Sequence, residues 1–127
     1  MPRVLIVDDE PGIRVALRRW FERQQWAIAE AGDGSHALTL LREADDAGPD
    51  RFDLVVCDLN MPNLSGEEIV RILQKERPHL VPRIVLTTGA SVACADAGSV
   101  LAEHPHVLQK PFDLGTLRTV IDGVHGG

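Results

Sequence analysis

The stretch VLIVDDE, residues 4–10, decides the fold of this chain. Its first four residues form a short, continuous apolar run, which is typical of a β-strand that is buried on both faces. Similar runs occur at 54–57 and 84–87, and a shorter one occurs at 107–108. A strand buried on both faces belongs to a parallel sheet that helices cover on either side. The apolar runs therefore predict an α/β protein.

Segments with helical periodicity alternate with these strands. The first follows Pro11-Gly12, and its apolar residues return every three or four positions, as on one face of a helix. This helix is expected to bury Ile13, Leu17, Trp20 and Phe21 and to expose Arg14, Arg18, Arg19 and Glu22. The other expected elements are a strand over 26–30, a helix around Ala37 to Leu41, a helix around Ile69 to Leu73 that Pro78 ends, a helix over 91–102 and a last helix that Asp113 caps. Alternating strands and helices predict a doubly wound, five-stranded parallel sheet with helices on both faces.

The composition is that of one folded domain. Of 127 residues, 44% are hydrophobic and 25% are charged, and the formal net charge is −6. A chain of this length builds a single core, so we expect one domain over 1–127 with no output domain. The acidic balance argues against nucleic acid or an anionic membrane as a partner, because both attract clustered Lys and Arg. No apolar run reaches the roughly 20 residues of a membrane span, so a cytoplasmic protein is expected.

The cysteines and histidines carry no signature of a metal site. Cys57 and Cys94 lack CxxC spacing, so reduced and partly buried thiols are expected. The histidines are scattered, and we interpret them as surface residues that neither bind metal nor donate phosphoryl groups. They are His36, His79, His104, His106 and His125.

Polar residues recur where the predicted strands end. Asp8 and Asp9 follow the first strand, Asp58 the third, Thr88 the fourth and Lys110 the fifth. Ligands of open parallel sheets bind beyond these carboxyl ends, so the five side chains are expected to meet at one rim. A single aspartate there is equally compatible with a helix cap, but three carboxylates together repel one another. Mg²⁺ relieves this repulsion because it prefers oxygen ligands, and Lys110 adds a second positive charge.

The chain resembles the receiver domains of two-component response regulators, the chemotaxis-regulator-like superfamily that works in phosphorelays. Four motifs carry the resemblance over nearly the whole length: VLIVDDE at 4–10, DLNMP at 58–62, TTG at 87–89 and KPF at 110–112. Their order and spacing agree with the family. The resemblance implies a flavodoxin-like sheet with strand order 2-1-3-4-5, and it implies a signalling module that catalyses only its own phosphorylation and dephosphorylation.

The same resemblance assigns roles to the acidic residues. Asp58 would accept a phosphoryl group from a sensor histidine kinase or a histidine phosphotransfer protein. Asp9 and Asp58 would bind Mg²⁺ directly, with Mn²⁺ as an alternative ion, and Asp8 would act largely through water. The main-chain carbonyl of Asn60 would complete the protein ligands of the metal.

Residues after the fourth and fifth strands would bind the phosphoryl group and change the protein surface in response to it. Thr88 and Lys110 fill these roles by resemblance, with Gly89 and Pro111 in support and a cis peptide bond before Pro111. Thr87 is the competing hydroxyl, but it lies within the predicted strand, whereas Thr88 precedes a small glycine. The expected response is a change of the surface around the fourth helix, fifth strand and fifth helix, which a downstream effector would read.

Two features depart from the family pattern. Many receivers carry Tyr or Phe where this chain has Val107, so an aromatic switch is not available for output. Asn60 and Ala90 occupy the positions that tune dephosphorylation in such proteins. Because Ala90 cannot orient an attacking water, we expect slower self-dephosphorylation than in relatives with a polar side chain there.

Two other functions fit parts of the pattern. A degenerate receiver would serve only for docking or for dimerisation, and a homodimer is also compatible with the main hypothesis. A small phosphatase of the haloacid dehalogenase type also uses a strand-end aspartate with Mg²⁺. That family places a second acid two residues after the nucleophile, and the corresponding residue here is Asn60. The phosphoacceptor receiver is therefore the preferred hypothesis.

Overall fold

A computed structural model describes residues 2–44, 51–59, 61, 64–89, 104, 106–110 and 112–126 of the chain. Five parallel strands form one sheet in the order β2-β1-β3-β4-β5. Their bounds are β1 Arg3–Val7, β2 Ala27–Ala31, β3 Leu54–Asp58, β4 Ile84–Thr88 and β5 Val107–Gln109. Both the parallel α/β fold and the strand order 2-1-3-4-5 are confirmed.

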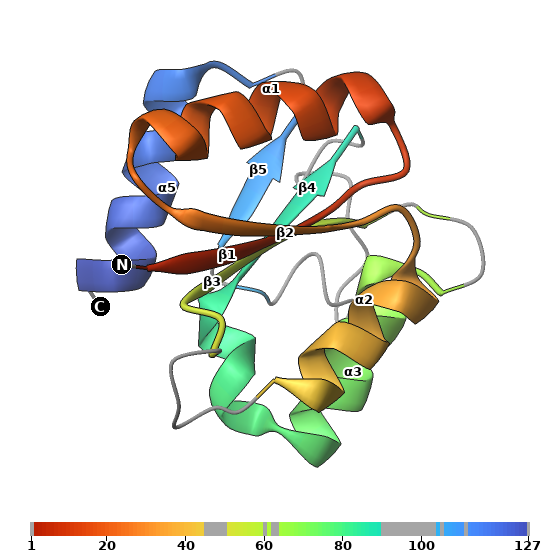
Figure 1. Cartoon of the computed structure of the whole chain (residues 1–127). Helices are drawn as coiled ribbons and strands as arrows, with labels where there is room; N and C mark the ends of the chain where they lie inside the picture. Colours follow the sequence, from red (N-terminus) through yellow and green to blue (C-terminus); the bar gives the residue numbers. More distant parts are fainter. Residues whose placement is uncertain are drawn as a thin grey trace.

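Helices cover both faces of the sheet (Figure 1). They are α1 Pro11–Arg23, α2 Gly34–Glu43, α3 Gly66–Glu76 and α5 Leu114–Gly126, with a 3₁₀ helix η1 over Pro78–Arg83. Helices α1 and α5 pack on one face, and α2 and α3 pack on the other. The helix predicted over 91–102 lies outside the described residues. Among the described helices, none is long and apolar enough to cross a membrane.

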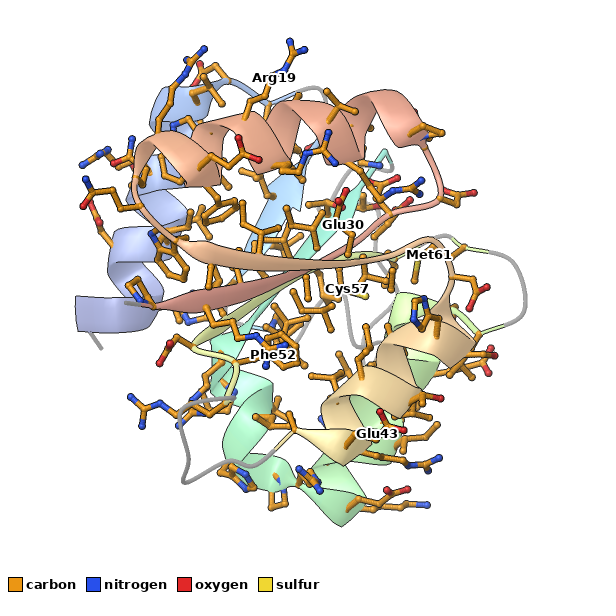
Figure 2. All side chains as sticks on the ribbon, viewed as in Figure 1. Arg19, Glu30, Glu43, Phe52, Cys57 and Met61 are labelled. Atoms are coloured by element: carbon orange, nitrogen blue, oxygen red, sulfur yellow. The ribbon has the colours of Figure 1, made fainter. Side chains whose placement is uncertain are left out.

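The alternation of side chains along each strand produces two separate cores. In β1, Val4 and Ile6 face α1 and α5, whereas Leu5 and Val7 face α2 and α3. All four are buried, which explains why the strand reads as a continuous apolar run. Cys57 lies in the α2 and α3 core (Figure 2) and is a free thiol, as predicted.

Polar side chains cap the start of α2, α3 and α5. Asp33 caps α2 by accepting a hydrogen bond from the amide of His36 at 2.8 Å, and Ser65 caps α3 through the amide of Glu68 at 3.2 Å. Asp113 accepts from the amide of Thr116 at 2.7 Å, which confirms it as the cap of the last helix. These caps satisfy amides that have no partner inside the helix.

Some predicted details were wrong. Asp58 and Thr88 are the last residues of β3 and β4 rather than the first residues after them. Arg14 and Arg18 were expected to face water, but both are half-buried and pair with Glu30 of β2. His104 was expected at the surface, but it is half-buried with its Nε2 against the carbonyl of Ile84. The errors at Arg14, Arg18 and His104 concern long polar side chains, whose burial depends on neighbours from other elements.

Candidate functional site

Strand register brings the predicted polar residues to one rim of the sheet. Val7 of β1 pairs with Cys57 of β3, so Asp8 and Asp58 follow neighbouring positions. Asp58 in turn pairs with Thr87 of β4, and Thr88 pairs with Gln109, which directly precedes Lys110. The strands are parallel, so their carboxyl ends lie on the same side.

Four carboxylates meet at this rim. Asp8, Asp9, Glu10 and Asp58 each place one oxygen within 4.8 Å of the others. Asp8 and Asp58 are buried, at 2% and 4% exposure, whereas Asp9 and Glu10 are exposed. Such a set of hard oxygen donors fits Mg²⁺, whose charge offsets the repulsion among the acids. Glu10 was missed in the sequence, although a third consecutive acid after the strand was a signal for it.

The ammonium group of Lys110 connects three of these acids. Its Nζ lies 3.0 Å from Oδ2 of Asp8, 3.4 Å from Oδ2 of Asp58 and 3.7 Å from Oε1 of Glu10. Burial lowers the pKa of Lys110, but the hydrogen bond to Asp8 and the charges of Asp8 and Asp58 outweigh this effect and raise the pKa above its usual value. The lysine is therefore a fixed positive charge at neutral pH.

Asp8 is held from several directions. Its Oδ1 accepts the amide of Glu10 at 2.9 Å, and its own amide donates to the carbonyl of Ala31 at 3.2 Å. Its Oδ2 accepts from Lys110, and its main-chain carbonyl accepts from the guanidinium of Arg14. Both carboxylate oxygens of Asp8 therefore already accept hydrogen bonds within the protein.

The backbone of Asp58 is tightly packed against the start of α3. A Cβ built on Gly66 would lie 2.6 Å from the carbonyl oxygen of Asp58 and 2.9 Å from the Cα of Leu59. The amide of Leu59 donates to the carbonyl of Thr87 at 2.8 Å, and its carbonyl accepts from Gly66 at 3.0 Å. The neighbouring Cys57 thiol is neutral, because burial, followed by the charges of Asp58 and Asp8, raises its pKa.

Two buried threonines end β4. Thr87 is the register partner of Asp58, and among the described residues its hydroxyl has no hydrogen-bond partner. Thr88 is one residue closer to the rim, and its carbonyl accepts the amide of Lys110 at 2.7 Å. Successive strand residues point to opposite faces, so the two hydroxyls differ in direction.

The other predicted site residues divide into two groups. Gly89 follows Thr88 at the rim and is exposed. Asn60, Ala90 and Pro111 lie outside the described residues, as does the peptide bond before Pro111. Phe112 is half-buried, and it lines a cleft of about 510 Å³ between α1 and α5 together with Ile13, Leu17 and Leu114.

Known proteins match this chain over most of its length. The family model of the response regulator receiver domain matches residues 4–122. The response regulator MprA of Mycolicibacterium vanbaalenii is 38% identical over 115 residues, which cover 91% of this chain and 46% of that protein. The transcriptional regulatory protein ResD of Bacillus subtilis is 34% identical over 110 residues, which cover 87% of this chain and 42% of that protein. The chain thus spans less than half the length of these relatives.

Solved structures share the fold and the length of the chain. The response regulator protein TrrA of Thermotoga maritima, in complex with Mg²⁺-BeF, is 28% identical with a TM-score of 0.79. The match covers 98% of this chain and 99% of that one. A second structure contains TrrA in complex with the histidine kinase ThkA, with the same identity and TM-score and 98% coverage of both chains.

Proposed function

This chain belongs to the response regulator receiver family, and on that premise we propose that Asp58 accepts a phosphoryl group. The observation that supports Asp58 is its position as a buried carboxylate at the strand rim, 3.4 Å from Lys110 and beside three further acids. One Oδ of Asp58 would attack the phosphorus of a phosphohistidine. The new O–P bond forms as the N–P bond breaks, and the departing imidazole takes a proton from solvent.

Mg²⁺ is the cofactor that the acidic cluster fits, and the TrrA complex with Mg²⁺-BeF supports this choice. Asp9 and Asp58 would hold the ion directly, together with the main-chain carbonyl of Asn60. Asp8 would act through water, since its carboxylate already bonds Lys110 and the Glu10 amide. When bound, the ion supplies positive charge to the phosphoryl oxygens. Mn²⁺ suits the same oxygen donors.

Lys110 and Thr88 would bind the product. Lys110 already contacts Asp58, so a small movement of its flexible side chain transfers the ammonium to a phosphoryl oxygen. Thr88 would donate its hydroxyl to another of these oxygens, and its carbonyl is bonded to the amide of Lys110. This bond links β4 to β5, so a shift of Thr88 would be felt in β5. Val107, registered with Leu86, has no ring to reorient, and the output would pass through the backbone.

The proposed partners are a phosphoryl donor and an effector. TrrA was solved with the histidine kinase ThkA, which supports a sensor histidine kinase, or a histidine phosphotransfer protein, as the donor. The effector would be either another protein or a second copy of this chain. It would recognise the surface around the helix expected over 91–102, β5 and α5. This role would be carried out in the cytoplasm, where ATP supplies the kinase with phosphoryl groups.

The decisive test is the mass of the intact protein after incubation with Mg²⁺ and acetyl phosphate. We expect the mass of one phosphoryl group to be added to the wild type and none to Asp58→Asn. Asp113→Asn is the matched control, because asparagine caps a helix as well as aspartate does. No added phosphate on the wild type, or addition that survives Asp58→Asn, would refute the proposal.

A second test separates the two threonine hydroxyls. Beryllium fluoride with Mg²⁺ is added to ¹⁵N-labelled protein, and the amide resonances of β5 are followed. We expect them to shift in the wild type and in Thr87→Ala but not in Thr88→Ala. The opposite result would transfer the switching role to Thr87, whose Cα pairs with that of Asp58.

A further inference from the structure

Arg14 occupies an unusual place for a residue on an amphipathic helix. It lies in the first half of α1, yet only 24% of its side chain is exposed. Its Nη1 donates to the main-chain carbonyl of Asp8, and its Nε lies 3.9 Å from Oε1 of Glu30. Glu30 extends from β2 toward α1 (Figure 2). The guanidinium therefore joins the end of β1, the helix that follows it and the neighbouring strand.

The loop between β2 and α2 leaves room for this guanidinium. A Cβ built on Gly32 would lie 3.3 Å from Nη1 of Arg14, closer than an ordinary van der Waals contact. Glycine at this position thus lets the planar guanidinium lie against the backbone. Arg14, Glu30 and Gly32 also line one small hollow between α1 and β2.

The carbonyl that Arg14 holds belongs to the peptide between Asp8 and Asp9. Because a peptide unit is planar, fixing its carbonyl also fixes the direction in which the chain leaves toward Asp9. From the other end, the amide of Glu10 is bonded to Oδ1 of Asp8. The three acidic residues after β1 are thus held by one bond at each end of a short turn.

We propose that Arg14 is a positioning residue for the acidic cluster. By holding the Asp8 carbonyl it keeps Asp8, Asp9 and Glu10 directed toward Asp58 against their mutual repulsion. This inference deepens the proposed function and rests on it where Mg²⁺ binding is concerned. The orientation of the turn formed by residues 8–10, however, does not depend on the metal and can be measured in metal-free protein.

The direction in which the affinity for Mg²⁺ changes when Arg14 is removed distinguishes a positioning role from a simple effect of its charge. If Arg14 acted only as a nearby cation, its removal would strengthen Mg²⁺ binding, because like charges repel. If Arg14 holds the turn, its removal weakens binding, because the carboxylates no longer converge.

Arg18 is the matched control, one turn further along α1. Its Nη1 lies 3.0 Å from Oε2 of the same Glu30, and its Nε lies 3.7 Å from Glu22. Within the described part of the chain, these are its ion pairs, and Asp8 is not among its partners. Methionine at either position keeps the aliphatic stem and removes every donor.

The experiment compares Arg14→Met with Arg18→Met in two measurements. In metal-free protein, we expect the Glu10 amide to exchange with solvent about fivefold faster in Arg14→Met, since one hydrogen bond of ordinary strength is lost. In calorimetric titrations with MgCl₂ alone, the same variant should bind about fivefold more weakly. Arg18→Met should match the wild type in both.

Each result decides the proposal. Unchanged Glu10 exchange, or unchanged or tighter Mg²⁺ binding in Arg14→Met, would overturn it. If Arg14→Met does not fold, Glu30→Gln removes the second anchor of the guanidinium, and it should accelerate Glu10 exchange relative to Arg18→Met. If the wild type takes up no phosphate, the proposed function fails, but the exchange measurement still decides the role of Arg14.

Discussion

At the scale of single residues, Gly66 is the position where a methyl group has the largest expected effect on Asp58. The Cβ of an alanine would meet the Asp58 carbonyl at 2.6 Å, and backbone atoms cannot move aside as a side chain can. We expect Gly66→Ala to lower the free energy of unfolding by about 1–3 kcal/mol, as overpacking does. It should also slow phosphoryl uptake at Asp58. Urea unfolding and the time course of intact mass with acetyl phosphate measure the two effects.

Gly12→Ala provides the comparison for Gly66→Ala. It also adds a methyl group near the start of a helix, but a Cβ there would have nothing within 4 Å. Phosphoryl uptake should stay at the wild-type rate. If both variants were slowed alike, contact with the Asp58 backbone would not be the reason.

His104 predicts a dependence of stability on pH. Burial lowers its pKa, the bond to the Ile84 carbonyl opposes this, and the charge of His106 lowers the pKa further. As the pH falls below about 6.5, His104 therefore takes up a proton more readily in the unfolded chain than in the folded one, and the protein loses stability toward acid pH. We expect His104→Gln to reduce the decrease in the free energy of unfolding between pH 7.5 and pH 5.5, as measured by urea unfolding. His36→Gln, at an exposed position of α2, should keep the wild-type loss.

The residues whose position at the rim was predicted correctly share one property. Asp8, Asp58 and Lys110 stand next to apolar runs, and the direction of a parallel strand is enough to place them at the rim. Arg14 and Glu10 could not be assigned in this way. A long polar side chain on a helix is normally solvated, and only the neighbouring strand with Glu30 shows that the Arg14 guanidinium turns inward.

At the scale of elements, α5 contains an interior glycine that destabilises it. Gly123 is exposed, and a Cβ built there would make only an ordinary contact of 4.0 Å with His106. Alanine has the higher helix propensity, and we expect Gly123→Ala to raise the free energy of unfolding by about 0.5–1 kcal/mol. Urea unfolding monitored by circular dichroism checks this. A loss of stability would mean that α5 needs the glycine for packing.

The central strands β1, β3 and β4 were predicted well because nearly all of their residues are buried, on both faces of the sheet. The apolar run ends at Cys57, however, whereas β3 continues to Asp58, and β4 likewise reaches Thr88. Backbone hydrogen bonds extend these strands, such as the one from Lys110 to the Thr88 carbonyl. Such bonds depend on the neighbouring strand and leave no mark in the local sequence. For this reason Asp58 and Thr88 were expected just outside strands that in fact contain them.

At the scale of the whole molecule, the acidic cluster links metal binding to folding. Asp8, Asp9, Glu10 and Asp58 bring four negative charges together at one rim, and Lys110 offers one positive charge to three of them. Folding without a cation must overcome the remaining repulsion. Asp8, Asp9 and Glu10 remain neighbours in the unfolded chain, but Asp58 comes from a distant segment, so its repulsion with the other three largely disappears when the chain unfolds. A cation that binds only the folded cluster must therefore stabilise the entire domain.

Thermal unfolding with and without MgCl₂ measures this link. At a Mg²⁺ concentration about 100 times its dissociation constant, the folded state should gain about 2.7 kcal/mol, and EDTA should reverse the gain. Asp9→Asn removes an exposed acid of the cluster, so the metal-free variant should be as stable as the wild type or more stable, while its response to Mg²⁺ should be much smaller. Asp33→Asn, which keeps the cap of α2, should respond like the wild type. An equal response in Asp9→Asn would mean that Mg²⁺ stabilises the chain without Asp9 as a ligand, and that the ion is held elsewhere.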